Sequence, residues 1–317
     1  MRFMVSGLVN IETTVKIRDF PIPYYPIDYP FWGIKSTVSG VAYNVGKALK
    51  KLENEVELFS FIGKDSAGKR ICTTIENEGI SSELICKTLT ETSETVVLVD
   101  KTGRRQIYCD LKDIQEKHID QDILCDMLIN TDIVVACNIN FNRNLLKQAK
   151  KMGITIASDV HVINSINDEF NKEFMEYADI LFLSDEQLPY KPESFIYDLK
   201  RRYGCEVITI GMGKKGALLY VKEDDKIYHL DAVKTNNVVN TVGAGDALFS
   251  AFLNFYSKGT HPLKALQLAE FFASRKIAFN GASEGFCEEK DILDMYREME
   301  RINICEVDID SRGYNHD

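Results

Sequence analysis

The stretch Asn240-Thr241-Val242-Gly243-Ala244-Gly245-Asp246 runs directly into an apolar series that ends near Phe255. Its glycines allow a tight turn and a close backbone approach to a ligand, and the apolar spacing after them is typical of a helix with one buried face. The free N–H groups and the dipole at such a helix N-terminus favour an anion. Asp246 lies in the first turn, where the dipole is expected to keep it ionised. The stretch therefore predicts a phosphate site beside a base; the structural alternative is a glycine-rich loop with a helix-capping acid.

Composition bounds the classes of protein to which the chain can belong. The 317 residues are 45% hydrophobic and 27% charged, which is enough apolar material for one large core. The formal charge of -10, without a long Lys/Arg run, argues against nucleic acid as a partner. The eight cysteines include no Cys-x-x-Cys pair, so we expect reduced thiols and a cytoplasmic protein. No apolar run approaches the ~18 residues of a membrane helix, so no membrane partner is expected.

Short β-branched or aliphatic runs alternate with helical patterns, which is the signature of a doubly wound α/β fold with a mostly parallel sheet. A hairpin (217–221 and 227–230) follows, and then helices from 243 to about 257 and from 262 to about 279. The whole chain, 1–317, is expected to form a single domain. The predicted strands of the main sheet are 3–9, 56–62, 133–137, 154–158, 180–183 and 207–210.

Two segments do not fit such a core. Residues 13–38 mix prolines with aromatic residues, and residues 94–109 contain two strand patterns joined by a turn at Gly103. Together they predict a small β-sheet that stands apart as a lid over a site. An ordinary packed, proline-rich excursion is the alternative for 13–38.

Two glycine motifs are not expected to carry chemistry. The segment 211–216 matches the dinucleotide fingerprint Gly-x-Gly-x-x-Gly, but it leads into a strand and not a helix, which argues against a nicotinamide site. The segment 63–69 matches a phosphate-binding loop up to its lysine, but Arg70 stands where a Ser or Thr would bind magnesium. The five histidines are scattered, and none has a partner nearby in sequence.

Over roughly residues 3–285, the sequence resembles the ribokinase, or PfkB, family of carbohydrate and nucleoside kinases. The family's late motif is Asp-Thr-x-Gly-Ala-Gly-Asp, which 240–246 matches except at its first position. Its early motif, a Gly-Gly turn, a helix with Asn, a strand and Gly-x-Asp-x-x-Gly, corresponds here to 39–44 and 63–68, with Ser39 in place of the first Gly. The resemblance implies a ribokinase-like fold with a small β-sheet lid.

The resemblance also implies roles on the acceptor side of the site. Asp246 would be the catalytic base, and the amides of Gly243, Ala244 and Gly245 would form the anion hole. The residues implied to hold substrate hydroxyls are Gly40, Asn44 and Glu12, the last standing where the family has an Asp five residues after Gly7.

On the nucleotide side, the resemblance implies ATP and Mg²⁺. The implied nucleotide-binding residues are Thr209, Gly211, Gly216, Gly281 and Ala282. The family's Asn-x-x-Glu falls on 184–187 and loses its terminal carboxylate, so Asp185 or Glu186 is expected to take over a water-mediated Mg²⁺ contact. Asn240 replaces an Asp linked in relatives to a monovalent-cation site, which leaves K⁺ activation open.

The sequence thus predicts an ATP-dependent kinase that phosphorylates a hydroxymethyl group of a sugar. A nucleoside kinase of the same family is the nearest alternative, because aromatic residues such as Tyr24 and Trp32 could stack on a base. A catalytically silent sugar-binding relative is the alternative from another class, motivated by the substitutions at 39, 187 and 240. The resemblance also implies a homodimer through the lid.

Overall fold

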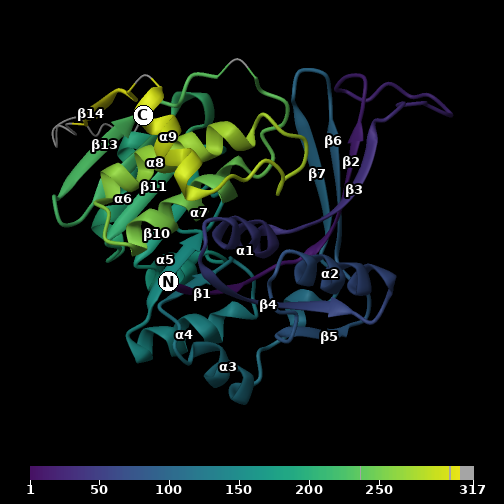
Figure 1. Cartoon of the computed structure of the whole chain (residues 1–317), viewed down its shortest axis with the longest axis horizontal. Coiled ribbons are helices and arrows are strands. Elements are labelled where there is room, and N and C mark those ends of the chain that lie inside the picture. The colour runs from purple at the N-terminus through teal and green to yellow at the C-terminus, as the bar shows by residue number, and fades with distance from the viewer. Residues whose placement is uncertain (236, 300, 308–317) are drawn as a thin grey trace.

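The computed structural model describes residues 1–235, 237–299 and 301–307. These residues form a large sheet covered by helices on both faces and a separate small sheet (Figure 1). The strands of the large sheet are β1 (Arg2–Ser6), β4 (Glu55–Gly63), β5 (Ile85–Leu89), β8 (Ile133–Ala136), β9 (Thr155–Asp159), β10 (Ile180–Ser184), β11 (Val207–Gly211), β12 (Ala217–Val221), β13 (Lys226–Leu230) and β14 (Ile304–Glu306). The helices are α1 (Val41–Lys51), α2 (Ser66–Asn77), α3 (Gln121–Leu128), α4 (Asn142–Met152), α5 (Lys172–Tyr177), α6 (Pro192–Arg202), α7 (Ala244–Ser257), α8 (Pro262–Lys276) and α9 (Glu289–Glu298), with 3₁₀ turns η1 (Ile114–Glu116) and η2 (Gly213–Lys215).

The order of the large sheet is β14-β13-β12-β11-β10-β9-β8-β1-β4-β5. The strands from β5 to β11 are parallel, and the hairpin β12–β13 with β14 extends the sheet antiparallel. The chain leaves β1 toward β4 on one side and returns to β8 on the other, so the direction of winding changes at β1. In a doubly wound sheet, ligands bind at the carboxyl ends of the strands around such a switch point.

Two apolar layers sandwich this sheet. Along β1, Phe3 and Val5 face one layer and Met4 faces the other, as the alternation of a strand requires. The first layer is formed chiefly by α1, α2, α7 and α8, and the second by α3, α4, α5 and α6. The strands are therefore buried on both faces, which explains their nearly continuous apolar runs.

The small sheet has the order β3-β2-β6-β7 and stands to one side of the main body (Figure 1). Its strands are β2 (Asn10–Lys16), β3 (Ile34–Ser39), β6 (Glu94–Val99) and β7 (Arg105–Asp110). The two strands predicted in 94–109 are confirmed as β6 and β7. In the other predicted lid segment, only the ends lie in the sheet, because 18–33 forms a proline-rich excursion without strands.

The predicted first strand, 3–9, is divided in the structure. β1 ends at Ser6, and the chain turns at Gly7 before it enters the small sheet as β2. A Cβ at Gly7 would lie 2.5 Å from the Sγ of Cys137, so this crossing point between the two sheets has no room for a side chain. Apolar composition alone did not reveal the break.

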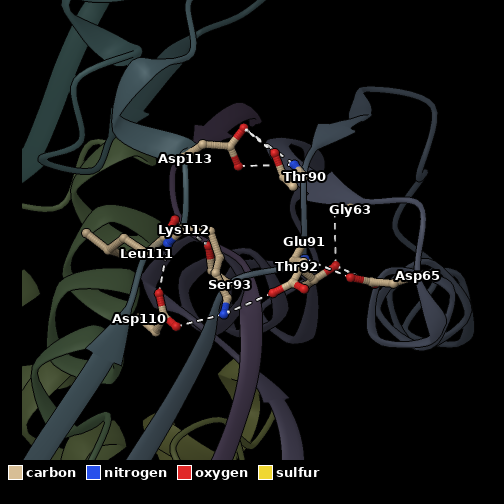
Figure 2. Close-up of polar contacts among 10 residues, drawn as sticks. All are labelled: Gly63, Asp65, Thr90, Glu91, Thr92, Ser93, Asp110, Leu111, Lys112 and Asp113. Carbon is tan, nitrogen blue, oxygen red and sulfur yellow. Dashed lines mark hydrogen bonds and ion pairs between the residues drawn. The ribbon is translucent and has the colours of Figure 1, made fainter.

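The base of the small sheet is tied to the main body by polar contacts (Figure 2). Asp65 accepts from the amide of Gly68, which caps α2, and from the amide and hydroxyl of Thr92 just before β6, at 2.7–2.8 Å. The Thr90 amide donates to Asp113 after β7 at 3.1 Å. Asp65 of the motif at 63–68 therefore anchors the segment that enters the small sheet at β6, and Asp113 ties the segment that leaves β7 to the same stretch at Thr90.

The C-terminal helices are confirmed, with the second one ending at Lys276, three residues before the expected end. The hairpin at 217–230 is also confirmed, and η2 is the only helical turn within 211–216, a stretch that the structure describes in full. Among the described residues, no helix combines the length and apolar character required to cross a membrane.

Candidate active site

The loop before α7 can only be built with glycine at position 243. Gly243 has φ +79°, and a Cβ there would lie 2.1 Å from the carbonyl oxygen of Ala282. The loop 240–243 is therefore pressed against the segment Gly281–Ala282, two stretches far apart in sequence. The long apolar face of α7 packs on α1 and α8, which fixes the direction of its N-terminus.

The N-terminus of α7 has three amides free to bind an anion. Among the described residues, the amides of Gly243, Gly245 and Asp246 donate to no acceptor, whereas the Ala244 amide donates to the carbonyl of Thr241 at 3.1 Å. Beside Gly245, the position of a Cβ faces open space. The predicted anion hole thus differs at one point, because Ala244 closes the loop and the Asp246 amide joins the free donors.

Asp246 is buried, with 8% of its surface exposed, and its carboxylate is held by α1. The Nδ2 of Asn44 donates to Asp246 Oδ2 at 2.7 Å. Burial raises the pKa of Asp246, while the nearby His161 and the Asn44 hydrogen bond lower it. The net direction is opposite to that expected from the helix dipole alone, and a carboxylate with a raised pKa is a stronger base.

His161 and Asp159 complete this cluster, and sequence reasoning missed both. One ligand-type atom of each lies within 4.8 Å of the others and of Asp246. The Nε2 of His161 is buried and has no partner among the described residues, and the residue has φ +58°, an uncommon value for a residue other than glycine. Their position at the end of β9 and just after it, at the carboxyl edge of the sheet, was the signal that could have identified them. The three groups lie close enough for Asp159 and His161 to act electrostatically on Asp246, in opposite directions.

Two buried amide oxygens have no partner among the described residues. They are Asn44 Oδ1, on α1, and Asn10 Oδ1, at the start of β2. Glu12 is 7% exposed and accepts from the hydroxyl of Ser39 at 3.0 Å, and burial raises its pKa. Unsatisfied amide oxygens are costly unless a ligand pairs with them, so this region suits a polyhydroxylated substrate. Asn10 was missed because its motif was read only at Gly7 and Glu12.

Gly40 has a structural reason to be glycine. Its φ is +99°, and a Cβ there would lie 2.4 Å from the carbonyl oxygen of Leu8. The residue brings the start of α1 against the turn between β1 and β2, and so places Asn44 beside Asp246. Its predicted contact with substrate would have to be made by its backbone.

On the predicted nucleotide side, Thr209 and Gly216 are both buried. Thr209 is fully buried in β11, and its hydroxyl has no partner among the described residues. Gly216 is buried as well, and a Cβ there would lie 1.8 Å from the carbonyl oxygen of Leu230, which gives the glycine a packing role. Gly211 remains partly exposed at the end of β11.

The predicted magnesium residues lie near the anion site and are paired with cations. Glu186 is 3.6 Å from Arg105 of β7, and the same guanidinium donates to the hydroxyl of Thr241 at 3.0 Å. Asp185 is 3.7 Å from Lys215. Two exposed or half-buried carboxylates beside the phosphate loop suit a hydrated Mg²⁺, which is bound by few protein ligands. Sequence reasoning missed Arg105, because nothing local indicates that β7 reaches the loop.

Both the oxygen and the nitrogen of the Asn240 side chain are hydrogen-bonded. Its Oδ1 accepts from the Val242 amide at 2.8 Å, and its Nδ2 donates to Asn280 Oδ1 at 3.1 Å. An ionised aspartate at 240 could accept the first bond but could not donate the second. The departure from the expected Asp therefore has a local partner in Asn280.

The chain was compared with known proteins. The family model described as "pfkB family carbohydrate kinase" matches residues 33–289. A ribokinase of Dictyostelium discoideum is 23% identical over 292 residues, covering 82% of this chain and 89% of that protein. Among solved structures, the microbiome-derived acarbose kinase Mak1 has a TM-score of 0.84 at 20% identity, over 94% of this chain and 99% of that one.

A nucleoside kinase of Methanocaldococcus jannaschii has a TM-score of 0.74 at 21% identity, over 94% of this chain and 98% of that one. These structural likenesses confirm the predicted fold, a large mostly parallel sheet with a separate small sheet. The solved structures differ in acceptor, since one is described as an acarbose kinase and another as a nucleoside kinase.

Proposed function

The chain belongs to the pfkB family of carbohydrate kinases, whose members include ATP-dependent sugar and nucleoside kinases, and we propose that it phosphorylates a hydroxymethyl group of a sugar. The observation that carries this proposal is the N-terminus of α7. A buried carboxylate, Asp246, adjoins the free amides of Gly243 and Gly245 in one helical turn. Phosphoryl transfer to an alcohol needs a proton acceptor and an anion site at this spacing.

In the proposed reaction, Asp246 accepts the proton of the substrate hydroxyl. The hydroxyl oxygen then forms a bond to the γ-phosphorus of ATP, and the bond between that phosphorus and the ADP oxygen breaks. The amides of Gly243, Gly245 and Asp246 stabilise the negative charge on the moving phosphoryl group. Asn44 keeps the carboxylate turned toward the acceptor, and Arg105 of the lid adds positive charge beside Thr241.

The acceptor would lie over Asn44, with Asn10 and Glu12 holding its other hydroxyl groups. Each of these three side chains is buried, and the two amide oxygens have no partner among the described residues. Gly40 shapes this region by bringing α1 close to β2. The apolar face of a sugar ring can pack on any flat apolar surface, so specificity for the acceptor would come from these polar atoms.

ATP would approach from the side of Gly211 and of the segment Gly281–Ala282, which touches the phosphate loop. Asp185 and Glu186 would hold a hydrated Mg²⁺, which neutralises phosphate charge. Occupancy by magnesium and nucleotide would replace the ion pairs of these carboxylates with Lys215 and Arg105.

The substitution Asp246→Asn tests the proposed base. We expect kcat to fall about 10²–10⁴-fold, because the amide cannot take the proton. ADP binding and the melting temperature should stay near wild type. Glu270→Gln is the matched control, since it replaces another buried carboxyl group, which lies in α8, with an amide, and it should keep wild-type kcat. Near wild-type turnover by the Asp246→Asn variant would contradict the mechanism.

A nucleoside acceptor is the second candidate, favoured by exposed aromatic side chains in the excursion 18–33. Tyr24 is 87% exposed, Phe31 86% and Trp32 99%, so they are available to stack on a base; Tyr43, in contrast, is buried in α1. ADP formation over a panel of sugars, sugar phosphates and nucleosides, with and without K⁺, separates the two. Binding without turnover for every acceptor would favour a catalytically silent relative.

We further propose that two copies associate through their lids. Val96 of β6 and Tyr108 of β7 are cross-strand neighbours on one face of the small sheet and are 39% and 53% exposed. A four-stranded sheet with apolar residues on an open face is more stable when that face is covered.

A further inference from the structure

Lys276, the last residue of α8, is a buried cation without a carboxylate partner. Its side chain is 0% exposed, and it forms an ion pair with none of the carboxylates that the structure describes. Burial lowers its pKa to about 8, while the more distant Asp246 and Glu12 act in the opposite direction. A lysine in such a place needs other groups to solvate its charge.

Backbone carbonyls of the phosphate loop provide that solvation. The Nζ of Lys276 donates to the carbonyl of Asn240 at 3.3 Å and, more closely, to that of Val242. The neighbouring carbonyl of Ile277 accepts from the amides of Val239 and Asn240 at 2.8 and 3.0 Å. The C-terminal end of α8 thus holds the loop on one side through its backbone and its terminal lysine.

Peptide geometry transmits this contact to the anion site. The carbonyl of Val242 and the amide of Gly243 belong to one planar trans peptide, so they point in opposite directions. Because the carbonyl is turned toward Lys276, the Gly243 amide is turned away from α8, where it has no acceptor among the described residues. Hydrogen bonding to the carbonyl also polarises the peptide and strengthens its N–H as a donor.

We propose that Lys276 is a positioning residue for phosphoryl transfer, an internal cation that binds the outer carbonyls of the phosphate loop and so aims its amides at the phosphate. This inference rests on the proposed kinase function of the same site. A primary ammonium and a soluble K⁺ or NH₄⁺ are alike in charge and in their preference for carbonyl oxygens. The enzyme therefore carries its own monovalent cation, and its turnover does not require added K⁺.

The substitution Lys276→Met tests this role, because methionine retains much of the length of the side chain without the charge. We expect kcat to fall about 10²-fold, the scale of losing one oxyanion donor. NH₄⁺ should restore part of the loss at constant ionic strength, and choline, a larger cation without N–H groups, should not. Arg275→Met is the matched control, since it makes a similar change at the adjacent, exposed position and should leave kcat unchanged.

Two further measurements keep the outcome clear. If Lys276→Met does not fold, as judged by melting, Lys276→Gln serves as the neutral variant that still has a donor. Calorimetry with ADP and with inorganic phosphate should show weaker binding by the variant than by wild type. A folded variant with wild-type kcat, or one with wild-type anion affinity and a loss that NH₄⁺ does not relieve, would overturn the proposal. If the wild type itself turns over no acceptor, the kinase proposal fails, and the binding comparison still decides the role of Lys276.

Discussion

At the scale of single residues, the bond between Asn44 and Asp246 joins two helices that are 202 positions apart in the chain. Asp246 has no charged partner in direct contact among the described residues, so its ionised form is favoured by the nearby His161, by this one amide donor and by the more distant Lys276. The same asparagine has a free oxygen that can meet the acceptor. One side chain thus couples the orientation of the base to the position of the substrate.

Removing this donor should change the pH dependence of the reaction. The Asn44 bond lowers the pKa of Asp246, so Asn44→Leu raises it, and the carboxylate becomes active only at higher pH. We expect the acid limb of the kcat/KM profile to move to higher pH, because the carboxylate of Asp246 loses the donor that favours its ionised form. Rate profiles from acid to neutral pH provide the measurement.

Asn54→Ala is the control for that experiment. Asn54 is also a buried asparagine near α1, and it bonds to the carbonyl of Leu49 and to Asn254, away from the site. Its removal should lower the melting temperature without moving the acid limb. An acid limb that stays fixed in Asn44→Leu would show that Asn44 does not tune the base.

At the scale of the elements, α7 and α8 pack against each other and contact the phosphate loop through opposite ends. α7 presents its N-terminus to the phosphate site, while α8 presents its C-terminal end to the outside of the same loop. Both helices are apolar around most of their circumference, since they pack on the sheet, on each other and on α1 or α9. α8 also buries the carboxyl group of Glu270.

Glu270 should make the protein less stable as pH rises. Burial raises its pKa from 4.5 to about 8, so the folded chain keeps a proton that the unfolded chain releases between these values. Unfolding therefore releases a proton, and the free energy of unfolding falls by up to about 1.4 kcal/mol per pH unit over this window. Below pH 4.5 the two states bind the same proton and the effect disappears.

Glu270→Gln removes the titration and should melt at a higher temperature than wild type, with a difference that grows from pH 4.5 to 8. Thermal melts of the two proteins over this range measure it. A difference that is constant with pH would mean that Glu270 does not hold its proton in the folded protein.

At the scale of the whole molecule, the small sheet is bound to the body at its base and reaches the active site at its far strand. Figure 2 shows the base, where Asp65 and Asp113 fasten the segments around Thr90 and Thr92. From β7, Arg105 contacts both Thr241 and Glu186. Any movement of the lid about its base would therefore change the charge beside the phosphate loop.

If the lids mediate dimerisation, charge on their open face should separate the copies. Val96→Asp places a carboxylate at the proposed contact without touching the residues that bind substrate. We expect sedimentation to show a dimer for wild type and a monomer for the variant. Hydrogen exchange should show that the amides of the small sheet stay protected in the variant, so that the sheet remains folded. A wild type that sediments only as a monomer at all concentrations would dispose of the dimer.

Local patterns in the sequence determined much of this protein: the alternation of strands and helices, the two lid strands β6 and β7, and the loop that opens α7. These features depend on spacing and on glycine, which act over a few residues. The break at Gly7, the internal use of the Ala244 amide and the burial of Thr209 were decided by neighbours distant in the chain. Distant neighbours also decided that His161 lies near Asp246, that Lys276 binds the carbonyl of Asn240, and that Arg105 contacts Thr241. The physical reason is that burial, desolvation and hydrogen-bond partners are properties of the packed molecule, and no local spacing encodes them.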